Sequence, residues 1–124
     1  MKKLPIGDEA PKTFDEACVV LKNSLEPDDI SYLKEHGANS VHFTFGMWMR
    51  NNWRLWEKDS PLGNYFRGIG LGHADDMSGC ILDFLDDYVN EREYDINKSI
   101  KRYQSYWLKR GVHPLTQEQL TWIV

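Results

Sequence analysis

Apolar side chains recur every three or four residues along most of this chain, the spacing that places them on one face of an α-helix. Strict alternation, which is typical of a half-buried strand, is confined to one short stretch. The pattern therefore predicts an all-α fold, a compact bundle of five or six helices. The expected helical segments are residues 14–25, 27–36, 43–56, 61–67, 75–91 and 96–110.

Capping residues support these boundaries. Thr13 with Glu16 three residues later forms a capping-box pattern. Ser60 before Pro61 is typical of an N-cap followed by proline at the first helical position, and Asp95 is a suitable cap for the last helix. Helix ends are predicted at Gly37, at the glycines in positions 68, 70 and 72, and at Gly111 with Pro114.

The stretch from Phe43 to Trp56, FTFGMWMRNNWRLW, holds three of the five tryptophans. It is expected to form a helix lying on the core, because each such ring buries about 150–250 Å². Arg50, Asn51 and Arg54 fall on the opposite side of this helix. Asn52 projects from the apolar arc and needs a polar partner, because an unpaired buried amide costs about 1–3 kcal/mol. The predicted inward set is Phe45, Trp48, Met49, Trp53, Leu55 and Trp56.

Three segments carry weaker patterns. From Ala38 to Thr44 the residues alternate as in a short strand, but a lone strand has nothing to pair with, so an extended lead-in is preferred. Residues 1–12 are expected to be loose. Residues 112–124 are expected to dock back onto the body, with a capping box at Thr116 and Gln119 and apolar contacts from Leu120, Trp122 and Ile123.

Length and charge narrow the function classes. The 124 residues fit a single domain, 1–124, and a formal net charge of -4 argues against a dedicated nucleic-acid binder while permitting a basic protein partner. The sequence has no bilayer-spanning apolar run and no signal-peptide core, so a cytoplasmic protein without membrane attachment is expected. Cys18 and Cys80 are interpreted as buried small hydrophobic residues, with no spacing that indicates a metal site. The glycines near residue 70 do not match a dinucleotide fingerprint, and no cofactor is predicted.

Two polar clusters carry the candidate chemistry. They are Arg50, Asn51 and Asn52 on the tryptophan-rich stretch, and His73, Asp75, Asp76 and Ser78 in GHADDMS at a helix start. With their neighbours they form the motifs FGMWxRNxWxLW and GxxHxDDMS, and these resemble an uncharacterised bacterial family of small proteins. The resemblance covers roughly residues 40–110 and implies a mainly helical fold without an established activity. Many members have a proline after the histidine, where this chain has Ala74, so the loop is expected to be less rigid here.

Two interpretations of these clusters stay open. In the structural one, Asp75 or Asp76 caps the helix and the other carboxylate lies near its positive end. Arg50 then pairs with one of them, and Asn52 binds a carbonyl in the GIGLGH segment. In the catalytic one, His73 is a general base beside a carboxylate and Arg50 holds an anionic substrate. A metal site is disfavoured, because adjacent carboxylates at a helix start point apart.

The outer faces of the last two long helices differ in charge. Residues 75–91 present Asp83, Asp86, Asp87 and Glu91, which are interpreted either as a solvated surface pairing with the next helix or as a docking surface for a cationic protein. Residues 96–110 present Lys98, Lys101, Arg102, Lys109 and Arg110. A nucleic-acid role for this basic face is disfavoured, because no exposed aromatic residues interleave with it.

The expected function is a protein-binding module, most concretely an immunity-type inhibitor that blocks a cognate bacterial toxin by steric occlusion. The alternative is a small hydrolase-like or other enzyme that uses His73 and Asp75 or Asp76, with Arg50 as the anion holder. A third class, a scaffolding or oligomeric protein, requires a large exposed apolar patch.

Overall fold

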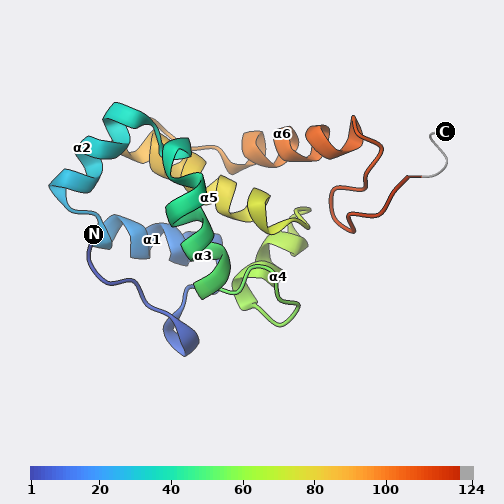
Figure 1. Cartoon of the computed structure of the whole chain (residues 1–124), viewed down its shortest axis with the longest axis horizontal. Helices are drawn as coiled ribbons and strands as arrows, with labels where there is room; N and C mark the ends of the chain where they lie inside the picture. The colour runs from blue at the N-terminus through green and yellow to red at the C-terminus, as the bar shows by residue number, and fades with distance from the viewer. Residues whose placement is uncertain (121–124) are drawn as a thin grey trace.

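The computed structural model describes residues 1–120, and its helices surround one long central helix (Figure 1). The all-α prediction is confirmed, since the regular structure of these residues is helical apart from one isolated bridge between Val112 and Gln119. The α-helices are α1 (Phe14–Ser24), α2 (Pro27–His36), α3 (Met47–Asn52), α4 (Pro61–Gly68), α5 (Ala74–Val89) and α6 (Ile96–Leu108).

Helix α5 is the centre of the core. Met77, Ile81 and Leu85 are completely buried, as the periodicity predicts, and so is Cys80 beside them. Helical spacing within residues 75–91 places Tyr88 in the same stripe as these residues, but Tyr88 is exposed. The five other α-helices all contact α5. Burying one such aliphatic side chain contributes about 1.5–3 kcal/mol, so packing around α5 is the main source of hydrophobic stabilisation.

The predicted caps mark the start of three helices. Thr13 Oγ1 accepts the amide of residue 16 at 3.1 Å, and Ser60 Oγ accepts the amide of residue 63 at 3.0 Å. Asp95 Oδ1 accepts the amide of residue 97 at 3.0 Å. Gly37, with a φ of 79°, ends α2 as expected. These boundaries were predictable because an N-cap hydrogen bond joins residues only two or three positions apart.

Both cysteines are free and buried, which confirms their interpretation as small apolar residues. Burial raises the pKa of the Cys18 thiol to about 12 and that of the Cys80 thiol to about 12. Both thiols therefore stay protonated at neutral pH and unreactive in their folded surroundings.

Residues 38–46 are helical, so the expected extended lead-in is wrong. A 3₁₀-helix, η2 (Ala38–Val41), is followed by a turn of π-helix, η3 (His42–Gly46), that leads directly into α3. The Ala38 amide donates to Asp86 Oδ1 on α5 at 3.1 Å. Val41, Phe43 and Phe45 alternate with polar residues, a spacing that does not indicate a helix, and Phe43 is 79% exposed.

The tryptophan-rich helix is shorter than predicted. It ends at Asn52, and the chain turns sharply at Arg54, whose φ is 57°. Trp53 and Leu55 are buried as expected, but they lie in this turn, and Trp56 is 55% exposed. The inward prediction for Trp56 is therefore wrong.

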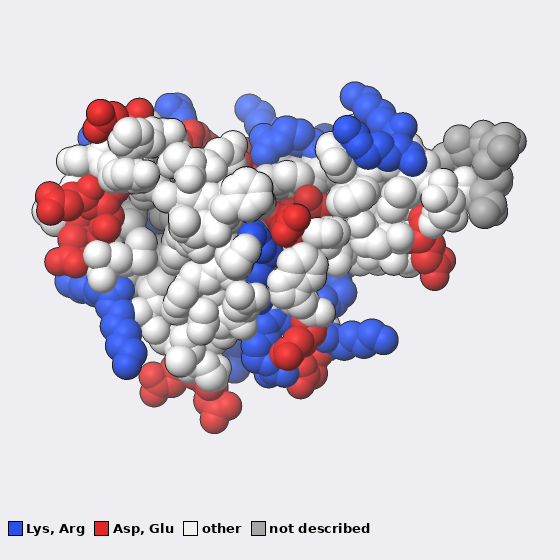
Figure 2. All heavy atoms as spheres, in the orientation of Figure 1, with Lys and Arg blue, Asp and Glu red and all other residues white. Residues whose placement is uncertain are grey.

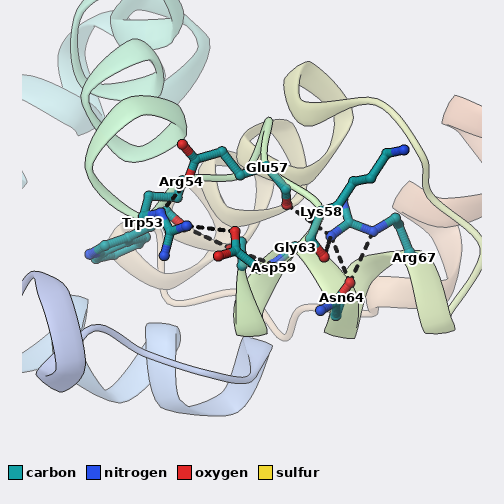
Figure 3. Close-up of polar contacts among 9 residues, drawn as sticks. Trp53, Arg54, Glu57, Lys58, Asp59, Gly63, Asn64 and Arg67 are labelled. Carbon is teal, nitrogen blue, oxygen red and sulfur yellow. Dashed lines mark hydrogen bonds and ion pairs between the residues drawn. The ribbon is translucent and has the colours of Figure 1, made fainter.

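Polar side chains hold the turn between α3 and α4 in place (Figure 3). Arg54 pairs with Glu57 and Asp59, while Arg67 on α4 donates to the carbonyl oxygens of residues 57 and 58. The Ser60 hydroxyl donates to the Trp53 carbonyl oxygen at 2.9 Å. Apart from the Arg54–Glu57 pair, which is three residues apart, these contacts do not have helical spacing, so periodicity did not indicate the turn.

The N-terminal segment contacts the body, contrary to the expectation that residues 1–12 are loose. The Lys2 amide donates to the Ser24 carbonyl oxygen at 2.8 Å, and the Trp53 indole donates to the Pro5 carbonyl oxygen at 2.9 Å. Leu4, between these two anchors, is buried.

The segment after α6 folds back toward the start of α5. The Gly72 amide donates to the carbonyl oxygen of Pro114, which is buried, at 3.1 Å. The capping box expected at Thr116 and Gln119 does not begin a helix; Thr116 Oγ1 accepts the amide of residue 118 within a turn. Leu120 is half-buried, and Trp122 and Ile123 lie outside the described residues.

Gly72→Ala is expected to release this returning segment, because a Cβ at that position would overlap the backbone of Leu115. Overpacking of this kind costs about 1–3 kcal/mol. Urea unfolding and hydrogen exchange of the residue-72 amide measure the effect. Gly68→Ala is the matched control, since its Cβ would meet nothing within 4 Å. An unchanged midpoint with a protected residue-72 amide would contradict this expectation, because the returning segment would then tolerate a Cβ at that position.

Candidate functional site

Arg50 lies inside the protein, not on the outer side of its helix where the periodicity placed it. Its side chain is 4% exposed. Nη1 donates to Ser78 Oγ at 2.8 Å, Nη2 donates to the His42 carbonyl oxygen at 3.3 Å, and Nε lies 3.3 Å from Asp75 Oδ1. Gly46 leaves room for this guanidinium, since a Cβ there would lie 3.0 Å from Nη1. Arg50 thus connects α3 and η3 to the first turns of α5.

His73 is the N-cap of α5, so the prediction that Asp75 or Asp76 has this role is wrong. Its Nδ1 accepts the Asp75 amide at 3.0 Å. Both aspartates lie in the first turn, where the positive end of the helix dipole favours a carboxylate. Because Nδ1 accepts a hydrogen bond, the neutral ring carries its proton on Nε2. The imidazole lies between two indoles, edge-on to Trp56 at 5.3 Å and stacked with Trp107 at 5.4 Å between ring centroids.

Asp76 is a buried carboxyl group with one indole partner. It is 7% exposed, and its Oδ2 accepts the Trp107 Nε1–H at 2.7 Å. Burial raises the pKa of Asp76 above its usual range, while the hydrogen bond from Trp107 opposes that rise. This contact joins the start of α5 to the last turn of α6.

The two asparagines lie apart from this cluster. Asn51 is exposed. Asn52 Nδ2 donates to the Trp48 carbonyl oxygen, four residues earlier on the same helix, at 2.9 Å. The expectation of a polar partner is therefore met, but the predicted partner in the GIGLGH segment is wrong. Such an i to i−4 contact is available to any helical asparagine, so the sequence alone did not require a distant partner.

The geometry favours the structural interpretation of the cluster. A carboxylate that orients a catalytic histidine accepts one of its ring N–H groups, but His73 Nδ1 accepts the Asp75 amide and lies 3.9 Å from Asp75 Oδ2. Three nitrogens of Arg50 already face acceptors, which leaves little capacity to hold a substrate anion. Among residues 1–120, no three His, Cys, Asp or Glu side chains are placed to hold a metal ion.

The four acidic residues predicted to bind a partner form a second candidate site, which we name the acidic surface: Asp83, Asp86, Asp87 and Glu91. Asp83 Oδ2 accepts from Ser99 at 2.8 Å, Arg102 at 2.6 Å and Tyr103 at 3.2 Å, all on α6. Asp86 and Asp87 pair with Arg92, at 3.0 and 2.9 Å. The expected pairing with the basic face of the next helix is thus limited to Asp83, while the other partner comes from the connecting loop.

A cleft of about 390 Å³ opens beside this surface, between η2, α5 and the start of α6. Three members of the acidic surface line it, together with Glu93 and Asp95 from the loop before α6. Sequence reasoning treated Asp95 only as a helix cap and did not assign Glu93. The signal was the acidic loop EREYD between two helices, which an antiparallel pair necessarily places beside the end of α5.

Comparison with known protein families identifies the chain. The family model described as a domain of unknown function, DUF6794, matches residues 10–88. The chain belongs to the DUF6794 family. The predicted resemblance to an uncharacterised family is therefore confirmed. The DUF6794 match begins before α1 and ends within α5, so it includes Arg50 and His73 but not α6.

Neither the curated proteins nor the solved structures contain a match to this DUF6794 chain. Within the described residues, no helix combines the length and the apolar character needed to cross a membrane.

Arg50→Ala is expected to destabilise the DUF6794 fold by about 1–3 kcal/mol, because it removes the donor to a buried hydroxyl and a carbonyl oxygen. Arg50→Lys should recover only part of the loss, since one ammonium group does not reproduce the guanidinium geometry. Urea unfolding measures both. Lys101→Ala, which removes an exposed cation from the surface of α6, should change stability by less than about 0.5 kcal/mol. A stable Arg50→Ala protein would contradict the structural role.

Asp76→Asn is expected to stabilise the protein at neutral pH. With its pKa raised, the folded state of Asp76 binds its proton more tightly than the unfolded state. Its contribution to stability is therefore present at acid pH and lost as pH rises through the folded-state pKa. Asparagine keeps an oxygen for the Trp107 donor and does not ionise.

The melting temperatures of this variant and the wild type should therefore converge below about pH 4, the usual range of an aspartate, and separate as the pH increases. Trp107→Phe removes the donor and leaves the carboxyl group buried. The melting temperature of this variant should therefore fall more steeply with rising pH than that of the wild type. Parallel pH profiles for all three proteins would show that Asp76 ionises without cost in the fold.

Proposed function

We propose that this DUF6794 protein is a protein-binding module that recognises a cationic partner through the acidic surface and its cleft. The observation that supports this most directly is the composition of the cleft. Five carboxylates line it, against the two basic side chains Lys98 and Arg102, an excess of three negative charges. A concave site with this imbalance attracts a basic surface and orients it during encounter.

The ion pairs already present at this site do not prevent a basic partner from binding. The side chains of Arg92 and Arg102 are 54% and 60% exposed. Exposed pairs contribute only about 0–1 kcal/mol. A partner's lysine or arginine can therefore replace Arg92 at Asp86 at small cost, whereas Arg102 is bound to Asp83, whose side chain is only 17% exposed.

The most concrete form of this proposal is an immunity-type inhibitor that occludes the basic active-site surface of a cognate bacterial toxin. Two features support it. The chain is small and carries a net charge of -4, and the contacts of Arg50 and His73 leave no free pair of groups suited to acid–base chemistry. Inhibition by occlusion requires only a rigid, complementary surface.

Co-expression with the product of the neighbouring gene, followed by a pull-down and titration calorimetry, tests the proposal. Asp86→Asn with Asp87→Asn should weaken binding by about tenfold or more at low salt, with a smaller difference at high salt. Asparagine at position 86 keeps an oxygen for the Ala38 amide, so the fold is preserved.

The matched control is Asp8→Asn with Glu9→Gln, which makes the same change in net charge on η1 (Gly7–Glu9), away from the cleft. This control should retain wild-type affinity. Equal weakening of binding by the two double variants would show that only the net charge of the protein matters. Absence of both a complex and relief of toxicity would reject the inhibitor.

A further inference from the structure

A second cavity, of about 430 Å³, lies between the N-terminal segment and α3. This volume is within the range of about 300–1,000 Å³ that small-molecule sites occupy. The residues that line it are Met1, Lys2, Lys3, Leu4, Ile6, Phe45, Trp48 and Asn52. Neither the catalytic nor the partner-binding interpretation uses this cavity.

One wall of the cavity is aromatic. Phe45 and Trp48 are only partly buried, and their rings stack at a centroid distance of 6.1 Å with 25° between the planes. Their position follows from the sequence: three residues apart on continuous helical turns, both side chains lie on the same face. The side of this pair that faces the cavity is apolar.

The opposite wall is held in place at two points. The Lys2 amide is bound to the end of α1, and the Pro5 carbonyl oxygen is bound to the Trp53 indole. Between these anchors Leu4 is buried, while Ile6 remains 50% exposed. The cavity is therefore preformed, and a ligand does not need to order the segment in order to bind.

The charged groups of this cavity are of one sign. Lys2 and Lys3 line it, no carboxylate does, and neither lysine forms an ion pair within residues 1–120. Figure 2 shows the same arrangement from outside: a broad area over α3 bears few charged side chains, and basic side chains lie at its edge beside the N-terminal segment. An apolar floor with two free ammonium groups at the edge complements a molecule with an apolar body and an anionic head.

The geometry points to a binding site for a free amphiphilic carboxylate, with the chain or ring of the ligand on Phe45 and Trp48 and the carboxylate between Lys2 and Lys3. Asn52 lines the same cavity; its Nδ2 is used by the Trp48 carbonyl oxygen, which leaves Oδ1 as an acceptor. A free ligand is favoured over a membrane surface, because Phe45 and Trp48 are partly buried, pack against the core and line a cavity of about 430 Å³.

Titration calorimetry of the whole chain with decanoate below its micellar concentration tests this site. Decanoate should bind with 1:1 stoichiometry, more tightly than acetate, which lacks the chain, and more tightly than decyltrimethylammonium, which reverses the charge. Lys2→Gln with Lys3→Gln should weaken decanoate binding about tenfold, the effect expected from two exposed charge contacts. Trp48→Leu should weaken it further, whereas Trp56→Leu, outside the cavity, should not.

Ile6 provides a pair of variants that does not depend on the core, since its side chain is half-exposed. Ile6→Asp places a carboxylate at the cavity and should weaken decanoate binding at least about threefold more than the isosteric Ile6→Asn. Circular dichroism confirms folding of every variant. Equal binding of decanoate and decyltrimethylammonium, or equal affinity of the two Ile6 variants, overturns the proposal. Binding to anionic vesicles without binding to free decanoate also overturns it.

Discussion

A guanidinium group that is removed from water must be given acceptors, and this requirement for Arg50 determines how the middle of the protein is built. Its acceptors come from three places: a hydroxyl on α5, a carbonyl oxygen in η3 and a carboxylate in the first turn of α5. Each must be in position at once, because a buried charge without partners costs several kcal/mol. One of these acceptors, the His42 carbonyl oxygen, lies at the start of the π-helical turn at residues 42–46. The irregular backbone there is thus part of the same interaction.

Several features of the fold could be predicted from the sequence because their causes are local. The caps at Thr13, Ser60 and Asp95 depend on residues two or three positions away, and the stripe on α5 depends on regular spacing alone. Arg50 could not be placed in this way. Helical periodicity assigns an arginine to solvent, and only the packing of α5 across α3 brings Ser78 within reach of its guanidinium.

The candidate site also combines features that the sequence predicted with features that it did not. The pattern GHADDMS correctly indicated a helix start with carboxylates at its positive end, but it did not show which residue caps it. Aspartate has the stronger general preference for that position; the structure uses His73, whose ring is also held between two indoles from distant parts of the chain. The acidic surface was readable from spacing, whereas its cleft depends on how the loop before α6 folds beside α5.

The family boundary has a consequence for the segment beyond it. The match to DUF6794 ends at residue 88, yet Trp107 covers Asp76 and stacks on His73, and Pro114 receives the Gly72 amide. The matched region therefore lacks residues that complete the surroundings of Asp76 and His73 in this chain. A fragment trimmed at residue 88 would open the start of α5 to water: Asp76 would lose the Trp107 donor, and His73 would keep only the contact with Trp56. Any study of the isolated family region should therefore retain the C-terminal helix and the turn that follows it.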